Sequence, residues 1–370
     1  MALTTEPVFI ERDAEAITAE MIARYEADSG KTLYPAQAER LLIDLIAYRE
    51  MLLRSAIQDA AKQNLVRYAR APMLDYLGEL VGVYRLAAQS AQTTLAFTVD
   101  TAPLTDVLIP AGLRVSASDS VIFATDTDAV LKAGATSVST TATCTEAGTV
   151  GNGWQPAQVS TLLDDVSDLL DLQVSNLTAT SGGSEQEDDE KLRERIMLAP
   201  EAFSTAGSRL AYRYHALSAH PDIVDVAVVS PTPGTVELYP LMSDGLPDEA
   251  VLTAVESLCS AEKVRPLTDT VTVSAPERVD YALHAQLVIK RGESSESVKA
   301  AAETAAAAWV QARAATLGKD IVLSQIMAAL SVSGVYDVSL TSPSQSLTVE
   351  EHQWAHCTGI EIVATGVSDE

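Results

Sequence analysis

Aromatic residues are scarce in this 370-residue chain, which has four Phe and three Trp and an aromatic share of 5%. Hydrophobic residues still make up 47%, so the cores must be built largely from Ala, Val, Leu and Ile. Cysteine is scarce as well, and Cys144, Cys259 and Cys357 lie far apart with no CxxC spacing. We therefore expect neither a disulfide framework nor a zinc ribbon.

Basic residues are outnumbered, with 25 Lys and Arg against 51 Asp and Glu and a formal charge of -26. The imbalance is uneven, because residues 1–85 hold ten basic and thirteen acidic residues. Residues 90–190 contain fifteen acidic residues and only Arg114 and Lys132 as basic ones. Such a surface repels phosphate, so we do not expect direct binding to nucleic acid. The acidity is typical of a soluble surface.

Long apolar runs are missing too, since no stretch reaches the roughly 18 residues that span a bilayer. Residues 1–10 lack a basic start followed by an apolar run, so we expect no signal peptide. We expect no membrane partner, and a protein that is made in the cytoplasm and kept or assembled there.

Motifs for catalysis are also lacking. The sequence has no GxxxxGK[ST] and no GxSxG. Gly148, Gly151 and Gly153 are not followed by a helix, and the paired carboxylates fall in solvated acidic runs. No nucleophile, base and orienting group come together, so we expect no enzyme, no catalytic residue and no cofactor.

The strongest candidate for a metal site is His352, His356 and Cys357. Two His four residues apart on a helix can share one metal ion. The segment has no fourth ligand and Gly359 follows at once, so we expect no metal. The other histidines are expected to be core or surface residues.

Helical periodicity dominates residues 1–90, which we interpret as a helical assembly region. A first helix begins after Asp13 and ends at Ser29-Gly30, and a second is predicted from Ala36 to Arg70. At about 1.5 Å per residue the second helix would be roughly 50 Å long. Its apolar residues form two neighbouring rows that need cover from partner helices, and these are the predicted interface residues: Leu41, Leu45, Tyr48 and Leu52 in one row, and Leu42, Ile46, Leu53 and Ile57 in the other.

From about Thr93 the period becomes alternating, which predicts a small β domain over residues 91–180. Residues 181–204 are interpreted as a linker and a short helix, with a hinge at Gly182 and Gly183. The acidic residues Asp188 to Glu190 suit the start of that helix. Residues 205–342 alternate strands with helices and indicate an α+β sandwich, and residues 343–370 are interpreted as a tail. The predicted fold class is therefore a multidomain α+β protein.

Seven stretches of the chain resemble, in the same order, the baseplate J-like proteins of contractile phage tails and R-type pyocins. The likeness covers roughly residues 10–357, and the stretch 182–196, GGSEQEDDEKLRERI, looks most typical of the family. The other stretches are 41–59, 74–83, 109–115, 147–152, 204–226 and 264–277.

The resemblance implies a structural subunit of a baseplate wedge, in a phage tail or tailocin particle, that forms a ring around the central hub and relays the change that triggers contraction. It also implies packing with a second copy and a smaller I-like wedge protein, and contacts with sheath-initiator and hub proteins. An alternative from the residues themselves is a receptor- or carbohydrate-binding module in the β domain. Only Phe97, Phe123 and Trp154 offer aromatic rings there. A hydrolase of unrecognised type is the third hypothesis.

Overall fold

A computed structural model describes residues 5–166, 171–203 and 207–368. The chain forms two compact units. The first, called the helical unit below, consists of Met1–Tyr84 and Leu192–Met197, and the second consists of Arg85–Lys191 and Leu198–Glu370. The predicted boundary between residues 204 and 205 lies outside the described residues.

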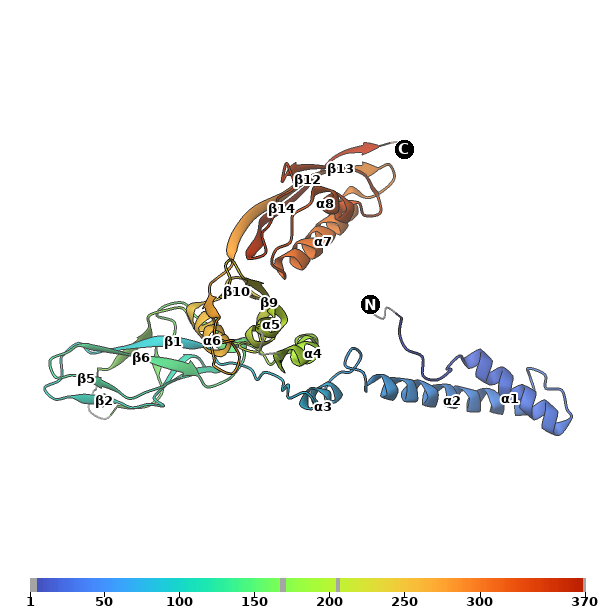
Figure 1. Ribbon diagram of the computed structural model, residues 1–370, viewed down its shortest axis with the longest axis horizontal. Coiled ribbons are helices and arrows are strands. Elements are labelled where there is room, and N and C mark those ends of the chain that lie inside the picture. Colours follow the sequence, from blue (N-terminus) through green and yellow to red (C-terminus); the bar gives the residue numbers. More distant parts are fainter. Residues whose placement is uncertain (1–4, 167–170, 204–206, 369–370) are drawn as a thin grey trace. The chain divides into compact units, whose positions relative to one another are not determined.

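Two helices lie side by side in the helical unit (Figure 1). Helix α1 spans Ala14–Ser29, and α2 spans Ala38–Lys62. The Asp13 carboxylate accepts hydrogen bonds from the first turn of α1, and Gly30 ends that helix with a φ of 66°. Ile17, Ile43 and Ala47 are buried between the two helices.

The predicted length of the second helix was wrong. Helix α2 ends at Lys62, so it is about 37 Å long, and turns follow it. The Asn64 side-chain amide donates to the carbonyls of Ala60 and Ala61. Such local bonds compete with the helical ladder, which explains the early end. A short helix α3, Met73–Glu79, completes this part of the chain.

The predicted β domain is an antiparallel sheet with strand order β7-β3-β4-β6-β1-β8, beside the pair β2-β5. Leu95, Phe97 and Phe123 are fully buried in its core, as their alternation predicts. The strands are β1 Gln92–Thr98, β2 Val107–Ile109, β3 Arg114–Ser118, β4 Val121–Thr125, β5 Ala129–Leu131, β6 Ser137–Cys144, β7 Thr161–Leu162 and β8 Gln173–Asn176.

The region predicted as one α+β sandwich contains two sheets, each with its own core. The first sheet has the order β11-β10-β9 and packs against helices α5 and α6. Its elements are α5 Arg209–Leu217, β9 Ile223–Val229, β10 Thr235–Met242, α6 Glu249–Cys259 and β11 Thr270–Val273, and α4 Asp189–Leu198 precedes them.

The second sheet has the order β13-β12-β14 and is covered by helices α7 and α8 on one face. Figure 1 shows the two helices against the sheet. The elements are β12 Glu277–Lys290, α7 Ser295–Ala314, α8 Leu323–Leu330, β13 Val335–Ser342 and β14 Gln353–Ser368. The predicted class, a multidomain α+β protein, is confirmed.

Residues 343–370 are not a separate tail, because β14 runs parallel to β12 along almost its whole length. Trp354 is buried, and its indole N–H donates to the carbonyl of Ala314 at 2.9 Å. Trp354 and the alternating Ile360 and Ile362 were the features of the sequence that indicated this strand. A parallel partner more than 60 residues away cannot be identified from such a local pattern.

Candidate functional site: an apolar helix surface and its supports

All eight predicted interface residues are exposed on α2. Their exposed fractions run from 41% for Leu52 to 62% for Leu41. At 3.6 residues per turn, the two rows together cover about half of the helix circumference. An exposed apolar surface this continuous is typical of interaction sites, and the interface on α2 stays a prediction. The full set, called the α2 surface below, is Leu41, Leu42, Leu45, Ile46, Tyr48, Leu52, Leu53 and Ile57.

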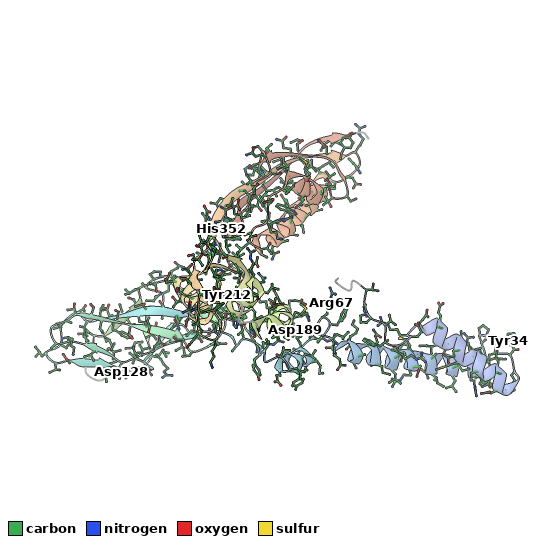
Figure 2. The ribbon with its side chains drawn as sticks, in the orientation of Figure 1. Tyr34, Arg67, Asp128, Asp189, Tyr212 and His352 are labelled. Atoms are coloured by element: carbon green, nitrogen blue, oxygen red, sulfur yellow. The ribbon has the colours of Figure 1, made fainter. Side chains whose placement is uncertain are left out.

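A groove of about 550 Å³ opens between α1 and α2 beside this surface. Ile17, Met21 and Tyr25 line it from α1, and Ile43 and Ile46 line it from α2. Because Ile46 also belongs to the α2 surface, the groove and one of the two apolar rows are continuous. The loop between the helices carries Tyr34, which is exposed too (Figure 2).

The side of α2 that faces away from the α2 surface is covered in part by the chain that precedes α1. Gln58 is fully buried, and its amide binds the main chain at Pro7 and at Phe9. Val8, between these two residues, is exposed. This contact was not predicted from the sequence. Its only signal was the short apolar run before Asp13.

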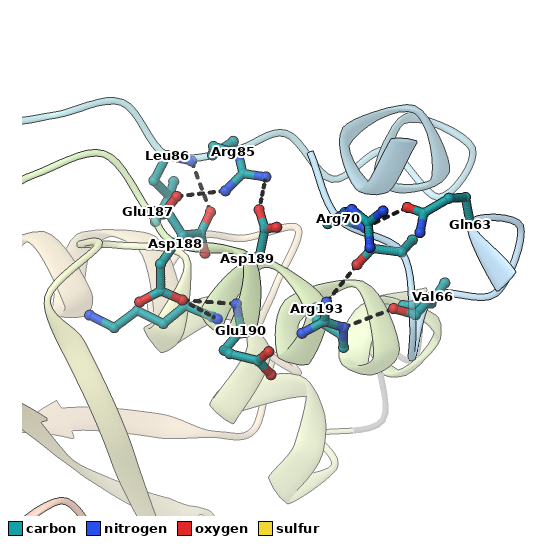
Figure 3. A network of polar contacts seen from close by, with 12 residues as sticks. Gln63, Val66, Arg70, Arg85, Leu86, Glu187, Asp188, Asp189, Glu190 and Arg193 are labelled. Carbon is teal, nitrogen blue, oxygen red and sulfur yellow. Dashed lines mark hydrogen bonds and ion pairs between the residues drawn. The ribbon is translucent and has the colours of Figure 1, made fainter. Parts of the chain in front are cut away.

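Two buried arginines of α4 support the far end of the helical unit, and Figure 3 shows the first of them, Arg193. Arg193 donates to the carbonyls of Val66 at 2.8 Å and Ala69 at 2.6 Å. Arg195 donates to the carbonyl of Tyr84 at 2.7 Å. Charge-assisted bonds of this kind satisfy main-chain groups that the turns after α2 leave without ladder partners. The role of these arginines was not predicted from the sequence, because their acceptors lie more than 100 residues away.

The acidic residues Asp188 to Glu190 lie at the start of α4, as predicted, and the acidic residues around this start have partners within the chain. Asp188 caps α4 by accepting from the N–H groups of Glu190 and Lys191 at 2.9 Å. Arg85 pairs with Asp189 at 2.7 Å, and the buried Glu187 carboxylate accepts from the N–H of Leu86 at 2.9 Å (Figure 3).

The predicted hinge lies against the β domain. Ser181 and Ser184 bond to the main chain of Gln92 and Gln89. The Asn152 amide accepts from the Gly183 N–H at 2.9 Å and donates to the Gly183 carbonyl at 2.7 Å. Gly182 has a φ of 85° with nothing within 4 Å of an added Cβ, so it is the freer of the two glycines. The hinge itself stays a prediction.

The candidate metal residues lie at strand β14 and not on a helix. His352 approaches Glu277 at 3.6 Å, His356 approaches Asp280 at 2.9 Å, and the Cys357 thiol donates to a main-chain carbonyl. Within the described ranges, no group of three or more His, Cys, Asp or Glu could hold a metal ion. The same ranges contain no helix that is both long and apolar enough to cross a membrane.

The aromatic residues of the β domain do not form a sugar platform. Phe97 and Phe123 are fully buried, and Trp154 packs against the same core. Sugar sites use exposed rings, so none of these three residues favours the carbohydrate-binding alternative.

Four family profiles match successive parts of the chain. They describe the Baseplate J-like N-terminal domain at residues 40–92, the barrel domain at 94–183, the central domain at 204–275 and the C-terminal domain at 281–363. A curated relative, the Baseplate protein J of Escherichia phage P2, is 39% identical over 186 residues. This alignment spans 50% of the chain and 61% of the relative.

A solved structure is also similar: the cryo-EM structure of the anti-feeding prophage (AFP) baseplate, 6-fold symmetrised. The alignment has a TM-score of 0.44 and 14% identity, and it covers 94% of this chain and 90% of that chain.

Proposed function

The chain belongs to the baseplate J-like family, and we propose that it is a structural subunit of a contractile-tail baseplate. In this role it works by assembly and not by catalysis. It forms part of a wedge in a phage tail or tailocin particle, joins a ring around the central hub, and relays the change that triggers sheath contraction. Its partners are a second copy, a smaller I-like wedge protein, and the sheath-initiator and hub proteins. Assembly takes place in the cytoplasm of the host bacterium.

The α2 surface is the observation that carries this proposal. Fully burying one Leu or Ile contributes about 1.5–3 kcal/mol. These eight residues are about half exposed, so covering them would contribute roughly 6–12 kcal/mol. Association costs an estimated 4–15 kcal/mol in lost freedom. A single partner helix covers only one row and gains about half of this free energy. A bundle that covers both rows gains all of it, so we favour a bundle.

Charge is consistent with copies packing at this place. The Lys and Arg of residues 1–85 nearly balance the Asp and Glu, whereas the rest of the chain carries most of the formal charge of -26. Two helical units can therefore approach each other without the repulsion that the rest of the chain would impose.

The test places charge in the α2 surface. Leu45→Asp with Leu52→Asp buries two carboxylates without partners in the bundle, which costs more than the leucines contribute. We expect the double variant to lose assembly with a second copy and with the co-expressed smaller partner, measured by co-purification and light scattering. Residues 207–341 should keep the hydrogen-exchange protection of the wild type.

Ala301→Asp with Ala308→Asp is the matched control, because both alanines are exposed on α7 and have the same spacing of seven residues. This control should assemble normally. Wild-type stoichiometry for the Leu45 and Leu52 variant would show that the α2 surface is not an interface.

A further inference from the structure

Strands β2 and β5 form a two-stranded ribbon of their own beside the larger sheet of the β domain, and Figure 1 shows them side by side. One face of this ribbon is buried: Val107, Ile109 and Leu131 are at most 5% exposed and pack in the cores of the domain. An antiparallel pair that buries one face normally carries polar residues on the other. The ribbon departs from that pattern.

The outer face of the ribbon is apolar at its centre. Leu108 is 51% exposed and Val130 is 39% exposed, and the two residues lie directly opposite each other in the register of β2 and β5. Side chains in such cross-strand positions touch. Leu104 is 97% exposed just before β2, where the Pro103 carbonyl accepts from the Gly134 N–H at 2.9 Å. Leu104, Leu108 and Val130, called the ribbon surface below, thus form an exposed apolar group of the kind that is typical of interaction sites.

Both basic residues of the β domain are already paired with carboxylates. Lys132, which follows β5, pairs with Asp106 at 2.7 Å, and Arg114 pairs with Asp164 at 2.6 Å. Residues 90–190 hold fifteen acidic residues and no other Lys or Arg. The domain itself therefore supplies no further positive charge to balance its carboxylates.

Three exposed carboxylates lie close to the ribbon in the chain. Asp100 precedes β2, and Asp126 and Asp128 precede β5. In the part of the chain that the structure describes, none of the three forms an ion pair with Lys or Arg. Their charge repels another copy of this acidic chain and attracts a cationic partner. An apolar centre with an anionic rim is complementary to a protein surface on which Lys or Arg side chains surround apolar ones.

We propose that the ribbon surface docks a basic surface of another baseplate component, on which Lys or Arg side chains surround an apolar centre. The inference rests on the proposed function, and it gives a partner of stated charge to the β domain. Leu108 and Val130 supply the apolar contact. The carboxylates beside them select the partner's cations against a second acidic copy.

The test maps the contact inside assembled particles. The full chain carries Leu104→p-benzoylphenylalanine, a photoreactive substitution at the most exposed residue of the ribbon surface, and is co-expressed with the other tail proteins. Purified particles are irradiated, and mass spectrometry identifies the crosslinked peptide. We expect a peptide from a different protein, in a segment where Lys and Arg outnumber Asp and Glu.

Two variants, each combined with the photoreactive residue, test the two parts of the surface. Leu108→Ser with Val130→Ser removes the apolar centre and should lower the crosslink yield at least about fivefold. Asp100→Asn with Asp126→Asn removes two negative charges and should lower it about twofold to threefold, because these charges are exposed. An unchanged yield in the asparagine variant would overturn the choice of a basic occupant.

Leu177→Ser with Val150→Ser is the matched control for the serine variant. These residues are 54% and 43% exposed in the β domain and lie outside the ribbon. The control should keep the wild-type yield. A ribbon variant that also keeps the wild-type yield, or a control that loses as much as the ribbon variant, would overturn the inference.

The remaining outcomes separate this inference from the proposed function. A crosslink to a second copy or to an acidic segment, or no crosslink in assembled particles, overturns the inference and leaves the proposed function standing. A chain that enters no baseplate particle overturns both. Wild-type hydrogen-exchange protection of the β1 amides shows that a lost crosslink is not a loss of folding. If the serine variant lacks that protection, the asparagine variant decides.

Discussion

The substitution Gly183→Ala tests whether Gly183 is tightly packed against the β domain or is free to move as a hinge. A Cβ on Gly183 would overlap the carbonyl oxygen of Gly148, and it would lie 2.8 Å from the side-chain oxygen of Asn152 and 3.1 Å from the nitrogen of Ala91. Two of these neighbours are main chain, so they cannot move aside as a flexible side chain would. The substitution should therefore shift the linker away from the β domain.

The magnitude follows from two contributions. Overpacking of a tight site costs about 1–3 kcal/mol. The two hydrogen bonds between Asn152 and Gly183 are lost when the linker shifts, at about 0.5–1.5 kcal/mol each. We expect Gly183→Ala to lower the free energy of unfolding of the β domain by about 3 kcal/mol or more.

Gly182→Ala is the matched control. An added Cβ at Gly182 would meet no atom within 4 Å, so the substitution costs only the strain of an alanine at positive φ, about 1 kcal/mol. Part of this cost is offset because alanine lowers the conformational entropy of the unfolded chain. Hydrogen exchange of the β1 amides measures the free energy of unfolding in both variants. A Gly183→Ala protein within 0.5 kcal/mol of the wild type would refute the packing argument and would favour the hinge at this residue.

The other predictions concern one buried arginine contact, made by Arg193, and two exposed ones, made by Arg24 and Arg114. Arg193→Leu removes both donors to main-chain carbonyls and should destabilise the helical unit by about 3 kcal/mol, measured by hydrogen exchange of α3. Arg24→Leu breaks only an exposed ion pair and should cost under about 1 kcal/mol, so equal losses would contradict the role of Arg193. Hydrogen bonds from the Arg114 side chain lower the pKa of the Asp164 carboxyl to about 2. The folded pKa is depressed below its ordinary value of 3.8, so the pair stabilises the fold above about pH 4 and less as the pH falls toward 2. Carbon-13 NMR should show a midpoint near 2 for Asp164 that rises in Arg114→Gln, and a wild-type midpoint near 3.8 would contradict the pairing.

The sequence predicted those parts of the candidate site that depend on neighbours along the chain. The eight residues of the α2 surface follow from helical spacing, and the place of Asp188 to Glu190 at a helix start follows from the preference of helix N-termini for acidic residues. The groove beside Ile46 and the support from Arg193 could not be predicted. They depend on which helix packs beside α2 and on main-chain carbonyls far away in the sequence.

Local periodicity by itself determined the helical region, the alternating strands around Phe97 and the multidomain α+β class, because burial of one face repeats at a spacing that the sequence records. Tertiary structure alone decided the rest. It placed Gln353–Ser368 beside β12, and it bound Pro7 and Phe9 to the buried amide of Gln58. Each of these depends on a hydrogen-bond partner brought close by the fold. A main-chain carbonyl or N–H is the same in every residue but proline, so the sequence around it cannot show which partner it will meet.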